Sequence, residues 1–168
     1  MTTINPYVYI ENKNNVDKIK YIIKEFNDYK RAFGFCFHNK QQNACNLFLK
    51  HYKKYDKNKT TIKPYLLIGD DFNDERLKKI NLDYDYRNIN DYEKDTNKIG
   101  YVVAQYNMGY DFKKIDYICI CDKKISYKDI IQCIGRGVRS DELGENGCNK
   151  AKYLYLIKHI MRTNKTPS

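Results

Sequence analysis

Short apolar runs that alternate with amphipathic segments constrain this chain more than any other feature. Residues 16–29 place apolar side chains at helical spacing, and the segment that follows Asn39 does the same. The expected strands are residues 6–10, 32–37, 65–68, 99–104, 117–121 and 153–157. Strands that alternate with helices indicate an α/β domain built on a mainly parallel sheet.

The remaining segments are less regular. Residues 71–80 are expected to form a helix, and the polar, Tyr-rich residues 81–97 a loop with a short helix. Neither an internal repeat nor a Gly/Ser-rich or Pro-rich linker divides the 168 residues, so a single domain is predicted. Asn39, followed three residues later by Gln42, has the pattern of a capping box at a helix start.

Composition limits where such a chain functions. No apolar run approaches the roughly 18 residues of a membrane span, and the first nine residues have no signal-peptide pattern. An intracellular, cytoplasmic location and no membrane partner are therefore expected. The six cysteines include no C-x-x-C pair, and four of them lie in apolar runs, which favours buried free thiols and no metal site.

The net charge of +10 suggests a polyanionic partner such as nucleic acid. A second explanation fits equally well. Lys, Asn, Ile and Tyr dominate the chain, as they do in products of AT-rich genomes, and this bias raises the lysine content without any function.

Residues 126–138 are expected to form a helix, and the segment from Ser126 to Arg139 has one chemically distinctive face. At 100° per residue, Gln132, Gly135, Arg136 and Arg139 fall together on the side opposite the apolar residues. Two guanidinium groups one turn apart match the geometry of a phosphate, and the glycine lets a ligand approach the backbone. The competing interpretation is a surface helix whose arginines are solvated.

A second candidate segment follows the strand at residues 99–104. Loops that leave the carboxyl ends of parallel strands are where ligands bind, and this loop contains Gly109 and Asp111. A carboxylate there is suited to holding a sugar hydroxyl. A glycine near an aspartate is common in turns, so this segment carries little weight alone.

Together, the G-Y-D loop, the strand after it and the helix with Q-C-I-G-R-G-V-R resemble motifs V and VI of superfamily 2 helicases. The strand at residues 32–37 followed by His38, Asn39 and Lys40 resembles motif IV. The resemblance covers residues 31–157 and is closest in style to helicases of large DNA viruses and restriction-type translocases. It implies the second lobe of such a helicase, a RecA-like three-layer sandwich.

The resemblance also implies roles for individual residues. Arg136 and Arg139 would act as arginine fingers on the γ-phosphate of ATP. The other expected nucleotide contacts are Gln132, Gly135, Gly109 and Asp111, and the expected nucleic-acid contacts are His38, Asn39, Lys40 and Gln105. Lys113 stands where the family usually has a proline, and no Thr or Ser precedes the motif V glycine, which weakens the assignment of that loop.

Two helicase elements are absent from the sequence, namely a G-x-x-x-x-G-K-[ST] phosphate loop and a D-E-x-[DH] magnesium motif. ATP and Mg²⁺ would therefore be held mainly by a first RecA-like lobe. We expect residues 1–168 to be one helicase C-terminal domain, part of a longer two-lobe protein, and inactive as an ATPase alone. The alternatives are a stand-alone nucleic-acid-binding module derived from a helicase lobe, and an unrelated α/β domain with chance motifs.

Overall fold

The computed structural model describes residues 15–103, 114–122 and 153–156. Their helices and strands follow one another as α1 (Asn15–Asp28), β1 (Phe33–His38), α2 (Gln41–Asp56), β2 (Lys63–Leu67), the 3-10 helix η1 (Glu75–Lys79), α3 (Ile89–Tyr92), β3 (Lys98–Val103), β4 (Tyr117–Ile120) and β5 (Tyr153–Leu156). The strands expected in these ranges are confirmed, with ends shifted by two residues at most. The expected strand at residues 6–10 and helix at 126–138 lie outside the described residues.

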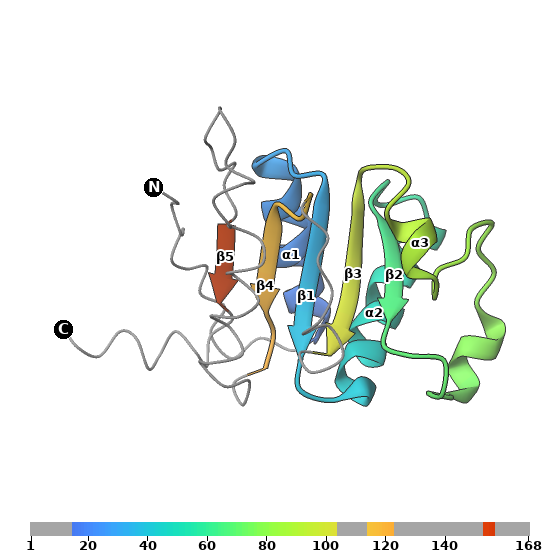
Figure 1. The fold of residues 1–168 in the computed structure, drawn as a ribbon. Helices are drawn as coiled ribbons and strands as arrows, with labels where there is room; N and C mark the ends of the chain where they lie inside the picture. Colours follow the sequence, from blue (N-terminus) through green and yellow to red (C-terminus); the bar gives the residue numbers. More distant parts are fainter. Residues whose placement is uncertain (1–14, 104–113, 123–152, 157–168) are drawn as a thin grey trace.

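The strands form one five-stranded sheet in the order β2-β3-β1-β4-β5, and every pairing is parallel. The arrowheads in Figure 1 therefore all point to the same edge of the sheet. β1 lies in the middle and pairs with β3 on one side and β4 on the other. Loops that follow these three strands start at a common edge, although long stretches of sequence separate them.

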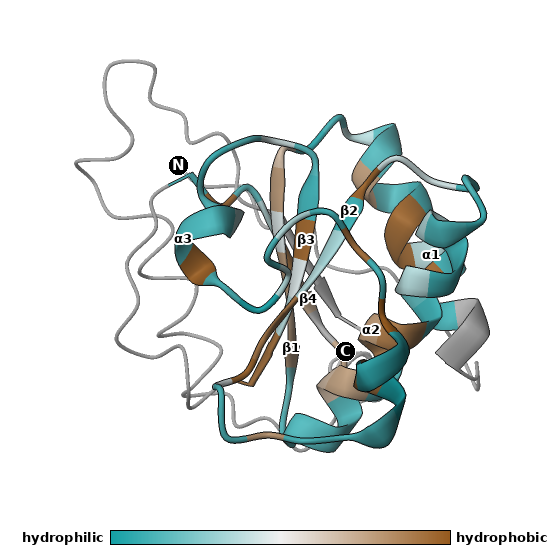
Figure 2. Cartoon of the chain, turned by 90° about the vertical axis from the view of Figure 1, so that its right-hand side faces the viewer, coloured by the Kyte–Doolittle hydropathy of each residue, from teal (hydrophilic) through white to brown (hydrophobic). Residues whose placement is uncertain are grey.

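α1 and α2 cover one face of the sheet, while α3 lies on the opposite side (Figure 2). Every residue of β1 and β3 is buried, as unbroken apolar runs in a parallel sheet predict. The helices contribute buried side chains at helical spacing, among them Ile19, Ile22, Phe26, Ala44, Leu47 and Phe48. The expected helical stripes thus pack against the sheet as predicted.

The short helix α3 is fixed by its own aromatic residue. The ring of Tyr92 stacks on that of Phe35 at 5.4 Å between centroids. Its hydroxyl donates a hydrogen bond of 2.8 Å to the carbonyl of Gly34. Nζ of Lys98 donates to the carbonyl of Asp91 at 2.7 Å and so reaches the end of the same helix. These contacts confirm the expected short helix within residues 81–97.

The helix expected at residues 71–80 is wrong. Only Glu75–Lys79 is helical, and as a 3-10 turn that begins at the N-cap Asp74. Leu77 is the single buried residue of the turn. Because one apolar anchor does not support a longer amphipathic helix, the rest of the segment stays irregular.

The described residues bear on two further expectations, which concern membrane spans and the cysteines. Among the described helices, none has the length and apolar character needed to cross a bilayer. The four described cysteines, Cys36, Cys45, Cys119 and Cys121, are free and buried as expected, whereas Cys133 and Cys148 lie outside the described residues.

Candidate nucleic-acid interface at the carboxyl edge of the sheet

The described site residues lie together at the carboxyl edge, the edge of the sheet at which the parallel strands end. Asn39 and Lys40 follow β1, and Asp122 follows β4. Their side chains therefore start from neighbouring strands. The other predicted site residues, Gln105, Gly109, Asp111, Gln132, Gly135, Arg136 and Arg139, lie outside the described residues. Of the predicted site, the structure thus describes only the part that follows β1.

His38, the last residue of β1, does not face solvent. Its side chain is 1% exposed, and Nδ1 lies 3.3 Å from the carbonyl oxygen of Val102 in β3. The ring lines a small cavity together with Asn43 and Asp122. These contacts do not test the expected nucleic-acid contact of His38, which stays a prediction.

Asn39 belongs to a polar cluster that joins β1, α2 and β4. Its backbone amide donates to Oδ2 of Asp122 at 2.9 Å. The side-chain amide of Asn43 donates to Oδ1 of Asn39 at 2.9 Å and to Oδ2 of Asp122 at 3.1 Å. The carboxylate of Asp122 thus accepts hydrogen bonds from two residues of the β1–α2 segment and holds this segment against β4.

The capping box expected for Asn39 and Gln42 is wrong. The N-cap of α2 is Lys40, which makes no side-chain capping hydrogen bond. The side chain of Asn39 is engaged with Asn43 instead. That of Gln42 reaches Oδ1 of Asn46 at 3.2 Å. Asp122 instead accepts a hydrogen bond from the amide of Asn39, one residue before the N-cap, and so fixes the entry to the helix.

The first turn of α2 keeps features that suit a phosphate. Lys40 is exposed, and the turn contains no acidic side chain. The amides of Gln41 and Gln42 occupy positions that have no intrahelical acceptor. Nε2 of Gln41 donates to the carbonyl of Ile68 at 2.8 Å, which ties the turn to the end of β2. A lysine beside a helix N-terminus can hold a phosphate oxygen without reading base sequence.

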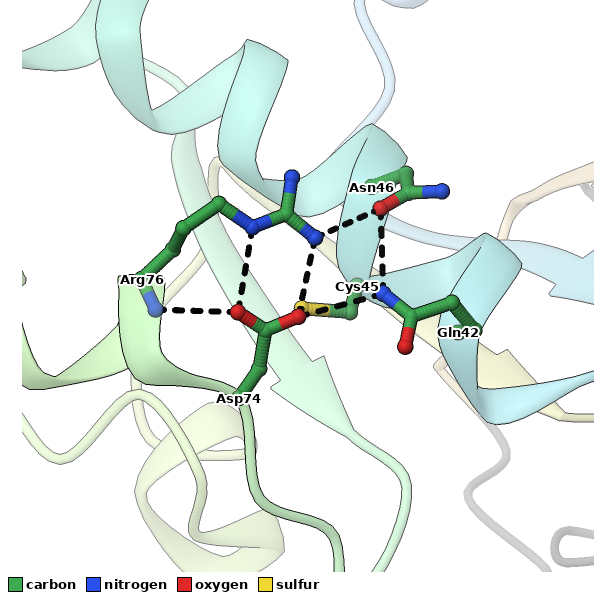
Figure 3. A network of polar contacts seen from close by, with 5 residues as sticks. All are labelled: Gln42, Cys45, Asn46, Asp74 and Arg76. Atoms are coloured by element: carbon green, nitrogen blue, oxygen red, sulfur yellow. Dashed lines mark hydrogen bonds and ion pairs between the residues drawn. The ribbon is translucent and has the colours of Figure 1, made fainter.

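A network beside this turn fixes α2 to the segment after β2 (Figure 3). The guanidinium of Arg76 donates to both carboxylate oxygens of Asp74, at 3.0 and 2.8 Å, and to Oδ1 of Asn46 at 2.8 Å. Nε2 of Gln42 also donates to Asp74 at 3.1 Å. Hydrogen bonds from Arg76 hold the pKa of Asp74 well below its usual range. The network therefore adds contacts to the start of α2 through Gln42 and Asn46, whereas Asp122 binds Asn39 and Asn43.

Sequence reasoning missed Asp122 and Asn43, which hold the edge together. The only available signal was position: Asp122 directly follows an apolar strand, as Asn39 nearly does. The two residues are 83 positions apart. Spacing along the chain therefore did not indicate that they meet.

The likeness of this chain to known proteins lies in its fold. No family model matches the sequence, and no curated protein matches it. Solved structures do match. The C-terminal part of the Fun30 ATPase domain superposes with a TM-score of 0.53 at 13% identity, over 87% of this chain and 41% of that chain.

Two further structures give the same result. Domain 2 of the DEAD-box helicase Mss116p, bound to an RNA duplex, has a TM-score of 0.56 at 15% identity, over 86% of this chain and 49% of that chain. A structure of S. cerevisiae Dbp5 bound to Gle1 and IP6 has a TM-score of 0.57 at 14% identity, over 96% of this chain and 40% of that chain. This chain spans less than half the length of each of these chains.

The likeness defines the fold class. The chain has the α/β fold with a parallel central sheet of RecA-like helicase domains, and the neighbours include a second helicase domain. Identities of 13–15% establish shared architecture and no more. The predicted closeness to viral and restriction-type enzymes stays a prediction.

Proposed function

We propose that this chain is the second RecA-like lobe of an ATP-dependent nucleic-acid helicase or translocase. The observation that carries the proposal is the parallel sheet, whose fold matches domain 2 of a DEAD-box helicase. The Q-C-I-G-R-G-V-R segment follows β4 in the sequence, where such a lobe would present residues to a nucleotide.

In this proposal ATP binds between this lobe and a first lobe, which holds Mg²⁺. Arg136 and Arg139 stabilise charge on the γ-phosphate during transfer. Gln132 and Gly135 approach the phosphates, while Gly109 and Asp111 approach the ribose. Gly109 and Asp111 follow β3, and the predicted helix with Gln132, Gly135, Arg136 and Arg139 follows β4. These two strands flank β1 and end at the same edge, and this placement supports a single shared site.

Nucleic acid would lie along the same edge. Lys40 supplies an exposed charge, the first turn of α2 supplies backbone amides, and Gln105 extends the track beyond β3. Asn39 contributes by setting the start of α2 and is itself bound to Asp122 and Asn43. Such contacts bind any sequence, as a motor that moves along a strand requires.

The first experiment tests the arginine fingers in the two-lobe protein. Arg136→Ala and Arg139→Ala should each reduce kcat for ATP hydrolysis by roughly 10³-fold or more while strand binding persists. Arg31→Ala is the matched control, because Arg31 precedes β1 at the opposite edge of the sheet and should leave kcat unchanged. Near-normal hydrolysis by the Arg136→Ala/Arg139→Ala double variant would refute the assignment. So would robust hydrolysis by the purified 168 residues.

The second experiment tests the strand track on the chain alone. Fluorescence anisotropy with a labelled single strand should show weak binding that falls with salt. Lys40→Ala should weaken binding and reduce the salt slope by about 1, whereas Lys53→Ala, in the last turn of α2, should not. If Lys40→Ala and Lys53→Ala weaken strand binding equally, nucleic acid does not bind at the start of α2. A complete gene product that binds strands but never hydrolyses ATP would favour the stand-alone binding module.

A further inference from the structure

Three buried thiols converge beneath the helices at the centre of the sheet. Cys36 lies on β1, and Cys119 and Cys121 lie on and just after β4. Their three sulfur atoms all lie within 4.8 Å of one another. Cys36 pairs directly with Cys119 in the register of the two strands, and Cys121 follows two residues later on the same face. The trio therefore results from strand pairing and not from sequence spacing.

We propose that Cys36, Cys119 and Cys121 bind one thiophilic d¹⁰ metal ion of the Zn²⁺ type, with Nε2 of His38 as fourth donor. Sulfurs bonded to Zn²⁺ at about 2.3 Å in a tetrahedron are about 3.8 Å apart. The sulfurs of Cys119 and Cys121 are 3.8 Å apart.

His38 provides an observation independent of the thiols. Its Nε2 is buried and has no hydrogen-bond partner within the described part of the chain. Nδ1 faces the carbonyl of Val102, so Nδ1 carries the proton and Nε2 presents a lone pair. A histidine that binds a metal typically donates its other ring nitrogen to a carbonyl in this way. An unpaired buried acceptor is costly, and a metal ion would satisfy it.

A cavity reaches two of the four donors, Cys121 and His38. It has a volume of about 190 Å³, and its lining includes His38, Cys121, Lys18 and Asp122. An ion therefore has a polar entry route that ends at one of the thiols and at the ring. This route distinguishes the trio from an ordinary set of core cysteines, which behave as small apolar side chains.

The charges balance when the ion binds. Zn²⁺ forms three Zn–S bonds as the three thiols release three protons to solvent, which leaves one net negative charge. Lys18 lines the cavity together with Cys121 and His38, and its ammonium group can offset the excess charge.

The test uses the reduced full chain and Co²⁺ as a spectroscopic probe. We expect one Co²⁺ per chain, with thiolate-to-cobalt charge-transfer absorption that Zn²⁺ removes. Cys119→Ser should abolish this absorption, whereas Cys45→Ser, which changes a buried free thiol outside the trio, should retain it. Loss of a residue that only orients a ligand costs about 10- to 100-fold in metal affinity, so His38→Ala, which removes a direct donor, should cost at least as much and keep the charge-transfer band.

Three outcomes would overturn the proposal: no absorption even after refolding with Co²⁺, absorption that survives Cys119→Ser, or absorption lost in the Cys133→Ser/Cys148→Ser variant. If Cys119→Ser does not fold, alkylation of the wild-type chain decides. Zn²⁺ should protect Cys36, Cys119 and Cys121 from a thiol reagent in partial denaturant while Cys45 reacts. Equal protection of Cys45 counts against the site.

Discussion

The backbone amide of Asn39 donates a hydrogen bond of 2.9 Å to the carboxylate of Asp122. This bond joins the ends of two adjacent parallel strands at the edge where the proposed nucleic-acid track lies. It also brings a negative charge to the start of α2, where a strand phosphate would bind. Asp122 thus stabilises the helix start and at the same time weakens the electrostatic attraction for nucleic acid.

Asp122→Asn should therefore tighten the binding of single strands. The new side chain keeps an oxygen that accepts from Asn39 but removes the negative charge at the start of α2. We expect an increase in affinity of roughly 2- to 5-fold at low salt, and less at high salt because the interaction is screened. Anisotropy titrations at two salt concentrations would measure it.

The matched control is Asp116→Asn. Asp116 accepts hydrogen bonds from the amides of Ala32 and Phe33 at the amino edge of the same strands. It resembles Asp122 structurally but lies away from the proposed track. Equal gains in affinity from both variants would mean that only net charge matters.

His51 should make stability depend on pH. Burial lowers its pKa to about 4, and the ring is held by the hydroxyl of Tyr101 and the carbonyl of Ile62, each at 2.8 Å. The folded pKa lies below the ordinary 6.5, so the unfolded chain binds more protons between these values. The stabilisation is complete above pH 6.5 and is lost as the pH falls toward 4, by at most about 1.4 kcal/mol per pH unit.

Urea unfolding from pH 4 to 7 would measure this slope. In His51→Gln the part of the slope due to His51 should disappear, although the variant is less stable at neutral pH because it loses a buried hydrogen bond. If wild type and variant lose stability in parallel across this range, other groups are responsible.

Asp74 should contribute more to stability than its exposed neighbour Glu75. Asp74→Ala removes the N-cap of η1 and the acceptor for Arg76 and Gln42, and we expect a loss of about 1 kcal/mol. Since the pKa of Asp74 is lowered in the fold, its contribution is present at neutral pH and is lost in strong acid. Glu75→Ala is the control. The side chains of Lys78 and Glu75 are 73% and 86% exposed. Loss of this ion pair should therefore leave the thermal unfolding midpoint almost unchanged.

The strands were predictable because a strand buried on both faces appears in the sequence as a run of apolar residues. All six residues of β1 are buried, so the run at residues 32–37 had no polar interruption. The segment at residues 71–80 had no comparable signal. It contains enough apolar residues to suggest a helix, but only Leu77 is buried in the turn that forms.

The site was less predictable because its contacts join distant segments. The bond from Asn39 to Asp122 spans 83 positions, and Cys36 meets Cys119 only because β1 and β4 pair in one register. Contacts of this kind depend on the order of the strands in the sheet, and the spacing of apolar residues does not indicate that order. His38 illustrates the same limit. The resemblance to motif IV implied a nucleic-acid contact for His38, yet both faces of β1 are covered and the side chain is buried.

Two glycines on opposite faces of the sheet should respond differently to alanine. A Cβ at Gly34 would lie 2.9 Å from the ring of Tyr117 and 3.1 Å from that of Phe26. These rings are buried and pack edge to face at 5.5 Å, so neither can retreat. A Cβ at Gly100 would lie 2.9 Å from Cδ1 of Leu67, the end of a side chain that can rotate, and 3.3 Å from two carbons of the Phe35 ring.

Gly34→Ala should therefore cost about 1–3 kcal/mol, and Gly100→Ala clearly less, because a rotamer change of Leu67 relieves most of its clash. Urea midpoints with unchanged m-values would measure both costs as stability. The order of the two variants is the informative result, since both add one methyl group to a buried, fully paired strand. A reversed order would mean that α1 can move away from β1 and β4 and that the packing of Tyr117 against Phe26 does not fix this helix.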